Sequence, residues 1–344
     1  MEQVAAALRR GWDGILNAID RGLVSVVTPV YNGESYLREC IESVLGQTYQ
    51  AWRYVIVNNR STDASLEIAE NYARLDSRIT VVNATEHLPV QESMSRAISL
   101  IEPDAIYCKP LMADDWLYPE CIETMLTSAL TDPAIGLVCC YAIKNGREVL
   151  FDTIQSTGGA VSFLSGRDAC RAALLEKDVH FFGSPTSMLI RADLIRKRKP
   201  FYNPTNLHVD EESCYDILQE SNFCFIHQVL AFIREHKRSQ TSLNRHLGSI
   251  LVGRVCSLAK YGPVYLSTHE FEQRRRQRFT EYYGFLARCA LRRLPPEFWQ
   301  YHREKLKLIG APLSGMRLAL AMCRHLAGRL VSAYSALRGG RFDS

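Results

Sequence analysis

Between residues 23 and 126, short apolar runs alternate with longer segments whose apolar residues recur every three or four positions. The short runs are almost uninterrupted, which is typical of strands buried on both faces of a sheet. They cover residues 23–28, 54–57, 79–82 and 105–108. The longer segments have the spacing of amphipathic helices and cover residues 37–45, 66–72 and 89–101. Because strands alternate with helices, the pattern predicts an α/β fold with a doubly wound, mostly parallel sheet and right-handed crossovers.

The later part of the chain is patterned less regularly. Residues 135–143 and 148–153 are predicted strands, and Asn145-Gly146 between them favours a hairpin. Residues 165–175 are spaced like a helix, and the chain after His236 is mostly helical.

Three regions follow from this pattern. Residues 1–22 are predicted to form an N-terminal amphipathic helix, residues 23–242 the α/β domain, and residues 243–344 a basic, mostly helical C-terminal region. Within the last region, Pro295-Pro296 is expected to interrupt the helices.

Composition narrows the class of protein. The 344 residues are 47% hydrophobic and 23% charged, which excludes a disordered or fibrous chain. The 11 cysteines are scattered without a CxxC pair, so neither a disulfide framework nor a zinc site is indicated and a cytoplasmic location is expected. No apolar run is long enough to span a bilayer, and residues 1–22 lack the apolar stretch of a signal peptide.

Positive charge gathers near the C-terminus. Residues 271–344 hold 15 Lys and Arg against 5 Asp and Glu, although the whole chain carries a formal net charge of only +4. The apolar residues Leu318, Met322, Leu326 and Leu330 recur every four positions there, which favours a helix on a membrane surface. The alternative is that this face packs on the α/β domain or on a second subunit. Nucleic acid is not an expected partner, because no recognisable binding module accompanies the charge.

Polar clusters follow three of the predicted strands. They are residues 29–33, 58–63 and 113–116. The carboxyl ends of parallel strands meet at one edge of a sheet, where ligands bind in open α/β folds. Neither GxGxxG after the first strand nor GxxxxGK[ST] occurs, so phosphates would be handled most simply by a divalent metal on carboxylates.

These clusters belong to segments that resemble a known family. The stretch from Val24 to Tyr49, VSVVTPVYNGESYLRECIESVLGQTY, resembles the opening of family 2 glycosyltransferases. Ser61-Thr-Asp63 and Ala113-Asp-Asp115 followed by Pro119 resemble later motifs of the same family. The resemblance covers roughly residues 23–242 and implies a GT-A fold, a nucleotide-sugar donor, a divalent metal and an inverting mechanism.

The resemblance also implies which residues bind the nucleotide. Pro29, Tyr31 and Asn32 would line its pocket. Asn58 stands where the family usually has an aspartate that reads uracil; an amide still offers a donor and an acceptor, and uridine remains the expected base. Asp63 is expected to cap the following helix.

The metal motif departs from the family pattern at its first position, where Met112 replaces an acidic residue. Asp114 falls on the second position, the usual ligand of Mg²⁺ or Mn²⁺ at the diphosphate, and Asp115 follows it as a further ligand. The alternative is that both aspartates only form a turn before the helix that begins near Pro119.

Two later segments complete the implied site. In residues 207–218, Asp210 falls on the family's general base and Glu212 on a second acidic position, and both are predicted to be catalytic; the alternative is a purely structural acidic first turn of a helix. In residues 234–242, His236 or Arg234 would face the metal or the diphosphate, unless His236 is structural. His180 is placed on the acceptor side, without a catalytic role.

The leading hypothesis is a metal-dependent, inverting glycosyltransferase that transfers a sugar from a nucleotide-sugar to a hydroxyl of a glycan or lipid-linked acceptor. It would work in the cytoplasm or on the inner face of the membrane. Met112 and Asn58 motivate the alternative of a non-catalytic nucleotide-sugar-binding or scaffold relative. A nucleotidyltransferase is a third option, but no Gly-rich loop follows the first strand.

Overall fold

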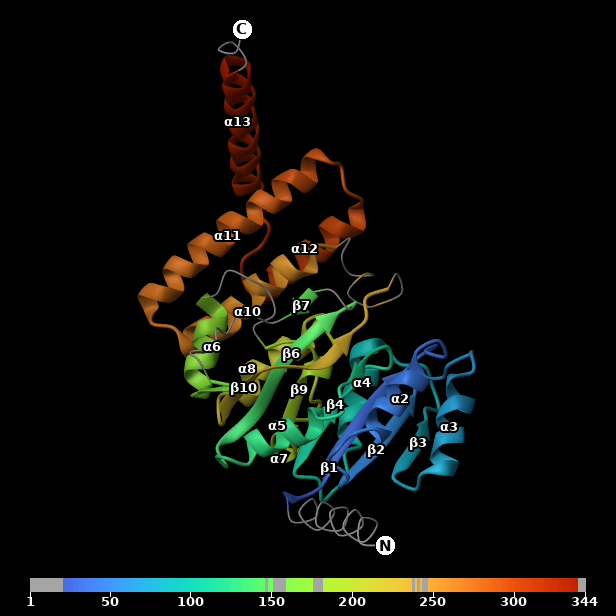
Figure 1. Ribbon diagram of the computed structural model, residues 1–344. Coiled ribbons are helices and arrows are strands. Elements are labelled where there is room, and N and C mark those ends of the chain that lie inside the picture. The colour runs from blue at the N-terminus through green and yellow to red at the C-terminus, as the bar shows by residue number, and fades with distance from the viewer. Residues whose placement is uncertain are drawn as a thin grey trace, which may run out of the picture. The chain divides into compact units, whose positions relative to one another are not determined.

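The computed structural model describes most of the chain and divides it into two compact units at His236–Lys237. We call residues 1–236 the sheet unit and residues 237–344 the helical unit (Figure 1). The helix predicted over residues 1–22 lies outside the described part except for its last two residues. His180 also lies outside the described residues. The described residues are 21–145, 148–150, 159–175, 182–236, 239, 242 and 247–339.

The sheet unit is built on one ten-stranded sheet with the order β3-β2-β1-β4-β9-β6-β10-β5, to which β7 is added beside β6 and β8 beside β10. The strands are β1 (Val24–Val30), β2 (Trp52–Asn58), β3 (Ile79–Asn83), β4 (Tyr107–Pro110), β5 (Trp116–Leu117), β6 (Ile135–Lys144), β7 (Glu148–Leu150), β8 (Val161–Leu164), β9 (Met188–Arg191) and β10 (Asn222–Ile233).

Most of the sheet is parallel, as the sequence predicts. Strands β3, β2, β1, β4, β6 and β10 run in one direction, whereas β5, β7, β8 and β9 run against their neighbours. The arrows of β1 and β6 in Figure 1 therefore point toward the same edge. The predicted hairpin is present, because β6 and β7 pair antiparallel on either side of Asn145.

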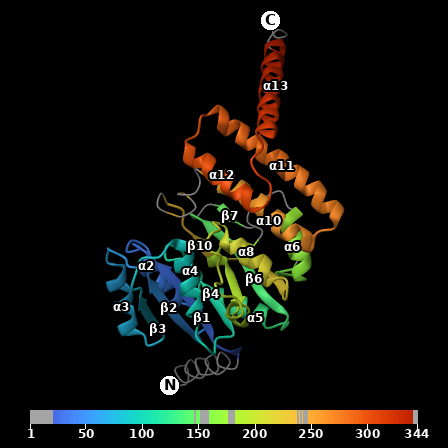
Figure 2. The ribbon, with the colours of Figure 1, turned by 180° about the vertical axis from the view of Figure 1, so that it is seen from behind.

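Helices cover both faces of the sheet. Helices α2, α3 and α5 lie on one face, and α4, α7 and α8 lie on the other, which Figure 2 shows from behind. This is the doubly wound arrangement expected from alternating strands and helices. The helices are α2 (Leu37–Leu45), α3 (Ser65–Leu75), α4 (Val90–Ser99), α5 (Cys121–Ala129), α6 (Gly166–Leu175), α7 (Ala192–Arg196) and α8 (Val209–Ile217), with a 3-10 turn η1 (Pro185–Ser187).

The structure differs from the predicted elements in several places, of which two bear on the site. β4 begins at Tyr107, two residues later than predicted, because Tyr107 is where register with Val24 of β1 starts. The pattern gave no assignment for β9, which lies between β4 and β6, or for β10, which lies between β6 and β5. The core is continuous across these strands, and full burial of a single Val or Leu side chain contributes roughly 1.5–3 kcal/mol.

The helical unit packs its own core. Valines of α10 are buried against aromatic and leucine side chains of α11 and α12, around Tyr282, Leu286 and Phe298. His302 is fully buried among them and its Nδ1 lies 2.6 Å from the Tyr282 hydroxyl. The predicted break at Pro295 separates two helices. The helices are α10 (Ser249–Tyr265), α11 (Thr268–Leu291), α12 (Pro296–Leu308) and α13 (Gly315–Gly339).

Long helices invite the question of membrane insertion. In the part of the chain that the structure describes, we find no helix whose length and hydropathy would let it cross a bilayer.

Candidate active site

The loops that follow β1 and β2 are tied together by reciprocal hydrogen bonds. The backbone N–H of Asn32 donates to Ser61 Oγ over 3.0 Å, and Asn32 Oδ1 accepts from the backbone of Thr62 over 2.8 Å. Asn32 has a φ of 51°, a left-handed conformation that Asn tolerates better than most residues. The backbone N–H of Gly33 donates to Ser65 Oγ over 2.8 Å. The two strand ends are thus held as one rigid surface.

Asp63 fastens the start of α3 to this surface. Its Oδ1 accepts from both the backbone and the hydroxyl of Ser65, and its Oδ2 accepts from the backbone of Glu34 over 3.0 Å. Partial burial would raise the pKa of Asp63, but the hydrogen bonds from Ser65 and Glu34 outweigh it and lower the pKa below 3.8. The expected capping role of Asp63 therefore agrees with its contacts.

Asn58 and Asn59 lie buried where β2 ends. Asn58 Nδ2 donates to Asn83 Oδ1 over 2.9 Å, and its Oδ1 accepts from the backbone of Ser61. Asn59 brackets Leu88, accepting from its N–H and donating to its carbonyl. In this arrangement both amide side chains hold neighbouring loops, so a base-reading role for Asn58 would need its side chain to exchange partners.

Tyr31 is the accessible aromatic side chain at the end of β1. It is 51% exposed and its ring centroid lies 4.4 Å from that of His87. His87 Nδ1 in turn lies 3.1 Å from the Asn59 carbonyl oxygen. Pro29 lies within β1, paired with Val57 of β2. The sequence pattern did not identify His87, because its contact with Tyr31 depends on the pairing of β3 with β2, the neighbour of β1.

Asp114 and His236 come together although 122 positions separate them in the sequence. Asp114 Oδ2 lies 3.1 Å from His236 Nε2, and both side chains are partly open to solvent. The ring of His236 lies 5.1 Å from that of Tyr36. The structure thus pairs two of the three residues predicted to bind a metal.

Asp115, the third predicted ligand, is buried and has other partners. Its Oδ2 accepts from the Thr186 hydroxyl over 2.5 Å, and its Oδ1 accepts from the Arg234 backbone over 2.8 Å. Burial, with the charge of Asp114 beside it, raises the pKa of Asp115 above its ordinary range. These contacts favour a role for Asp115 in positioning the Arg234 segment rather than in binding a cation.

Thr186 is a site residue that the sequence pattern missed. Besides donating to Asp115, its hydroxyl accepts from the backbone N–H of Met112 over 3.2 Å. The fully buried Lys109 donates to the carbonyl groups of Thr186 and Met188 and so fixes η1 in place. The loop that carries Asp114 is therefore held by the Thr186 hydroxyl, and Thr186 is itself held by the buried Lys109.

Arg234 lies across the same loop. Its Nε donates to the Asp114 carbonyl oxygen over 3.0 Å, and its guanidinium forms an ion pair with Glu39. The guanidinium also lies 4.6 Å from the centroid of the Tyr36 ring. Each contact restrains the chain that leads into His236.

The two predicted catalytic carboxylates of α8 have different surroundings. Glu212 is buried, and its oxygens accept from the side-chain amides of Asn203 and Asn206. Within the described part of the chain, no hydrogen-bond donor contacts the partly exposed carboxylate of Asp210. The charge of Asp210 adds to burial in raising the pKa of Tyr202. Of the two, Asp210 has the accessible carboxylate that a base requires, whereas the contacts of Glu212 favour a positioning role.

Solved structures with the same fold include sugar-transferring enzymes. TarS 1-349 of S. aureus, solved in complexes with UDP and UDP-GlcNAc, aligns over 93% of both chains with a TM-score of 0.61 and 14% identity. The mannosyltransferase PcManGT of Pyrobaculum calidifontis, solved with GDP-Man and Mn²⁺, aligns over 98% of this chain and 92% of its own with a TM-score of 0.52 and 16% identity. The GT-A fold implied by the resemblance is thereby confirmed.

Sequence relatives agree with the fold. Glycosyltransferase GlyA of Streptococcus pneumoniae is 36% identical over 128 residues, 37% of this chain and 18% of its own. The putative glycosyltransferase EpsH of Bacillus subtilis is 34% identical over 128 residues, 35% of this chain and 34% of its own. The matched regions thus span about a third or less of these two relatives.

The match to a family is broader than the match to either relative. Residues 25–198 fit the family described as glycosyl transferase family 2, a region that holds the loops after β1 and β2 and both aspartates after β4. The chain therefore belongs to glycosyl transferase family 2.

Proposed function

We propose that the chain is a metal-dependent, inverting glycosyltransferase that uses a nucleoside diphosphate sugar. The observation that carries the proposal is the partly exposed Asp114–His236 pair, 3.1 Å apart, which lies at the strand ends of a family 2 domain. Ligands of open α/β sheets bind at such edges. The acceptor is a hydroxyl group of a glycan or a lipid-linked sugar.

The donor binds across the ends of β1 and β2. Its base lies against the exposed ring of Tyr31, next to Pro29 and Asn32, and uridine is the base that we expect first. Complexes of structurally similar proteins contain UDP, UDP-GlcNAc and GDP-Man, so both bases belong in a donor screen. Asn58 supports this pocket through Asn83 and Ser61 rather than from its surface.

The side chains fit a divalent cation that the substrate helps to bind. No cluster of three or more ligating side chains occurs in the described ranges, but Mg²⁺ is commonly held by one or two carboxylates together with substrate phosphates. Asp114 and His236 would hold Mg²⁺ or Mn²⁺, which would supply positive charge at the diphosphate. Asp115 is outside this set because both of its oxygens already accept hydrogen bonds.

Asp210 takes the proton in the transfer step. The acceptor oxygen attacks the anomeric carbon opposite the diphosphate, the bond from that carbon to the diphosphate oxygen breaks, and its electron pair leaves with the nucleoside diphosphate. The acceptor hydroxyl proton passes to the Asp210 carboxylate. Attack from the opposite side inverts the configuration. The eleven free cysteines support a reducing, cytoplasmic setting for this enzyme.

A donor screen with a matched variant tests the proposal. The full chain is incubated with UDP- and GDP-sugars and Mn²⁺, and release of nucleoside diphosphate is measured. The variant Asp114→Asn should lower turnover by roughly a hundredfold or more, because it removes a charged ligand. The control Asp104→Asn, at an exposed position before β4, should stay within about twofold. Full activity of Asp114→Asn, or full activity in excess EDTA, would contradict the proposal.

A further inference from the structure

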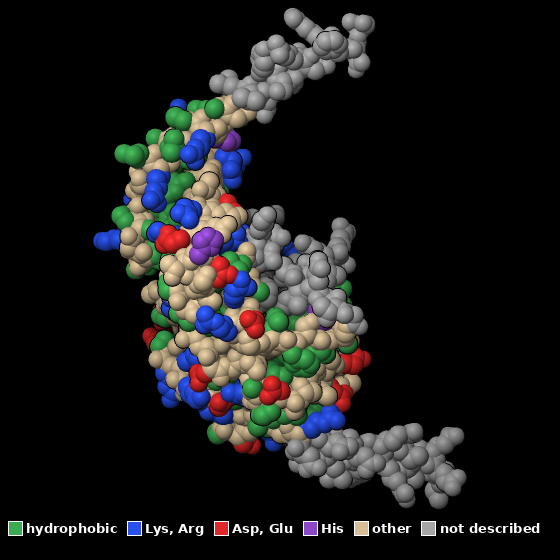
Figure 3. Space-filling view, turned by 90° about the vertical axis from the view of Figure 1, so that its left-hand side faces the viewer, with side chains coloured by type: hydrophobic (Ala, Val, Ile, Leu, Met, Phe, Trp, Pro, Cys, Tyr) green, Lys and Arg blue, Asp and Glu red, His purple; other side chains and the backbone are tan. Residues whose placement is uncertain are grey.

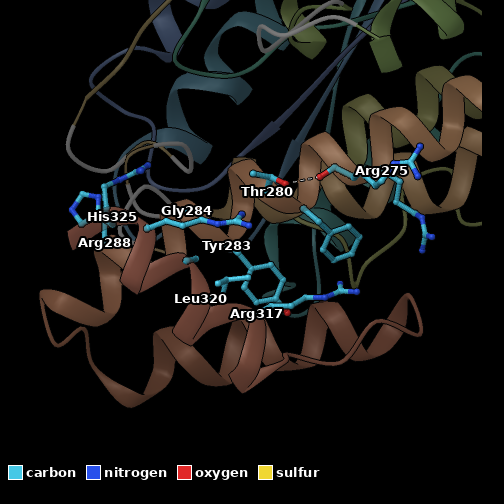
Figure 4. Close-up of a pocket in the computed structure, with 12 residues that line it drawn as sticks. Arg275, Thr280, Tyr283, Gly284, Arg288, Arg317, Leu320 and His325 are labelled. Carbon is cyan, nitrogen blue, oxygen red and sulfur yellow. Dashed lines mark hydrogen bonds between the residues drawn. The ribbon is translucent and has the colours of Figure 1, made fainter. Parts of the chain in front are cut away.

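A cavity opens between α11 and α13 within the helical unit. Its volume is about 570 Å³. Five arginines and a histidine line it: Arg275, Arg276, Arg288, Arg317, Arg324 and His325. Figure 4 shows Arg275 at one end, Arg288 and His325 at the other, and Tyr283, Leu320 and Arg317 between them.

The positive charge of this cavity is largely unpaired. Arg275 forms an ion pair with Glu272 over 2.9 Å. Across the residues that the structure describes, none of the other four lining arginines has a carboxylate within ion-pairing distance. The sequence cannot supply one from α13, because no Asp or Glu occurs between Glu304 and Asp343. The cavity therefore presents guanidinium groups without an anion.

The floor of the cavity is apolar and well fixed. Tyr283 is only 4% exposed, and its hydroxyl accepts from the backbone N–H of Ser314 over 2.9 Å. Phe279 packs against the core of the unit, and the Arg317 guanidinium lies 5.6 Å from the centroid of its ring. The five arginines are exposed to solvent around this floor, so an anion can reach their guanidinium groups.

Large apolar side chains are exposed beside the arginines. Met316, Leu320 and Leu326 of α13 are 84%, 52% and 45% exposed. Figure 3 shows green apolar and blue basic side chains intermingled near the start of α13. Leu318, which the sequence pattern assigned to the membrane-facing side, instead packs against the core of the helical unit. The exposed apolar residues of α13 thus include Leu326 of the predicted side, together with Met316 and Leu320, which the pattern did not identify.

We propose that the α11–α13 cavity binds the phosphate head group of an anionic phospholipid. Guanidinium groups match phosphate oxygens with paired hydrogen bonds. Met316 and Leu320 would then lie at the boundary between head groups and acyl chains, where exposed apolar side chains are buried. A soluble phosphate would satisfy the arginines but would leave this apolar side in water. The proposal concerns a site in the helical unit and is independent of the transfer reaction.

Vesicle co-sedimentation of the full chain tests the site. The probes are phosphatidylcholine vesicles with and without phosphatidylglycerol. Binding is expected only to the anionic vesicles. The double variant Arg317→Gln/Arg324→Gln should weaken it roughly 25-fold, at about fivefold for each arginine. The control Arg292→Gln/Arg303→Gln removes the same charge from exposed positions outside the cavity and should weaken binding less than about threefold.

A second variant pair separates the apolar contribution from the charge. Leu320→Gln should weaken binding several-fold, whereas Leu308→Gln, at an exposed position of α12 that does not line the cavity, should not. If both arginine double variants lost vesicle binding equally, binding would depend on overall positive charge rather than on the cavity, and the proposal would be overturned. Failure of the full chain to bind anionic vesicles would also overturn it.

Two further probes identify other anions. Inorganic pyrophosphate that displaces the vesicles in a calorimetric titration at low concentration would assign the cavity to a soluble phosphate instead of a lipid. A DNA duplex retained through the same two arginines, Arg317 and Arg324, would assign it to nucleic acid. Either result would overturn the lipid proposal, and absence of both would support it.

Discussion

The candidate active site of the sheet unit and the α11–α13 cavity of the helical unit differ in how their charged side chains are paired. At the strand ends of the sheet unit, polar and charged side chains contact each other: Asp114 lies beside His236, and Arg234 pairs with Glu39. In the helical unit, Arg317 and Arg324 line a cavity and lack a carboxylate partner in the described part of the chain. The first arrangement fixes side chains in position, whereas the second leaves positive charge that an added anion would neutralise.

This difference follows from what each surface is proposed to do. A catalytic constellation needs its groups oriented before the substrate arrives, because every contact made in advance lowers the entropy cost of reaching the transition state. A docking surface for anions gains affinity from groups that are not yet neutralised. The pairing at the strand ends and the unpaired arginines of the cavity are therefore separately testable, and each prediction below changes one side of the comparison.

The largest effect is expected from the one carboxylate of α8 that lacks a hydrogen-bond donor among the described residues. Asp210→Asn keeps the shape of the side chain and removes its basicity, so turnover should fall by roughly a hundredfold or more with donor KM little changed. Steady-state kinetics on the best donor of the screen measure both parameters.

Glu212→Gln is the matched comparison for Asp210. Its oxygens hold Asn203 and Asn206, so the substitution should alter the acceptor KM and thermal stability more than turnover. If Glu212→Gln gave the larger loss of turnover, the roles of the two carboxylates would be exchanged.

Acid should weaken the helical unit over the pH range in which its buried histidine takes up a proton. Burial lowers the pKa of His302 from 6.5 to about 4, so the unfolded chain takes up the proton first as the pH falls. The contribution of neutral His302 is complete above pH 6.5 and is lost progressively toward pH 4, by about 2–3 kcal/mol. Hydrogen exchange of the α12 amides at a series of pH values measures it.

The sheet unit titrates through other groups, and burial lowers the pKa of His227 below 6.5, so part of its stability is also lost as the pH falls. The pKa of Asp63 is lowered, so its contribution is lost only below its ordinary value of 3.8. The pKa of Asp115 is raised, so it adds stability to the sheet unit as the pH falls. His302→Gln should abolish the slope of the helical unit; a slope that survives in this variant would assign it to another group.

A smaller effect is expected from the buried anchor of the site. Asp115→Asn leaves either the Thr186 hydroxyl proton or the Arg234 backbone N–H without an acceptor, at a cost of about 1–2 kcal/mol. For a unit of this size that corresponds to a fall in Tm of about 3–6 °C. Differential scanning calorimetry measures it, with Asp104→Asn as the unaffected control.

The position of Asp115 also shows how far the sequence could be interpreted. The apolar runs of β1 to β3 and the polar residues after them predicted the edge of the sheet at which the site lies, because burial on both faces leaves a clear local pattern. The motif placed Asp114 and Asp115 side by side, but not their different surroundings. Those depend on Thr186, which lies 71 positions from Asp115 in the sequence, and no local pattern reports such a contact.

Strand β10 illustrates the same limit at the level of the fold. It delivers Arg234 and His236 to the site, yet its sequence has no simple alternation. Its register with β6 shifts three times, so its inward and outward positions change along the strand. His87 was not identified for a related reason, since its contact with Tyr31 exists only once β3 has paired with β2, the neighbour of β1.

The smallest effects come from one exposed ion pair in each unit. Glu39 is 56% exposed where it meets Arg234, and exposed pairs contribute about 0–1 kcal/mol, so Glu39→Gln should change Tm by less than about 3 °C and turnover by less than about threefold.

Glu272→Gln in the helical unit removes the carboxylate that pairs with Arg275 and leaves this arginine free to contact an anion in the cavity. Binding to anionic vesicles should therefore strengthen by roughly two- to fivefold. Calorimetry and kinetics on the first variant, and co-sedimentation on the second, measure these changes. A small loss of stability or turnover in Glu39→Gln, together with a gain of vesicle binding in Glu272→Gln, would mean that the two ion pairs have different roles. The pair at the strand ends would position side chains, whereas the pair at the cavity would compete with a bound anion. A loss of vesicle binding in Glu272→Gln would show that Glu272 supports the cavity instead of neutralising it, and the contrast between the two units would fail at that residue.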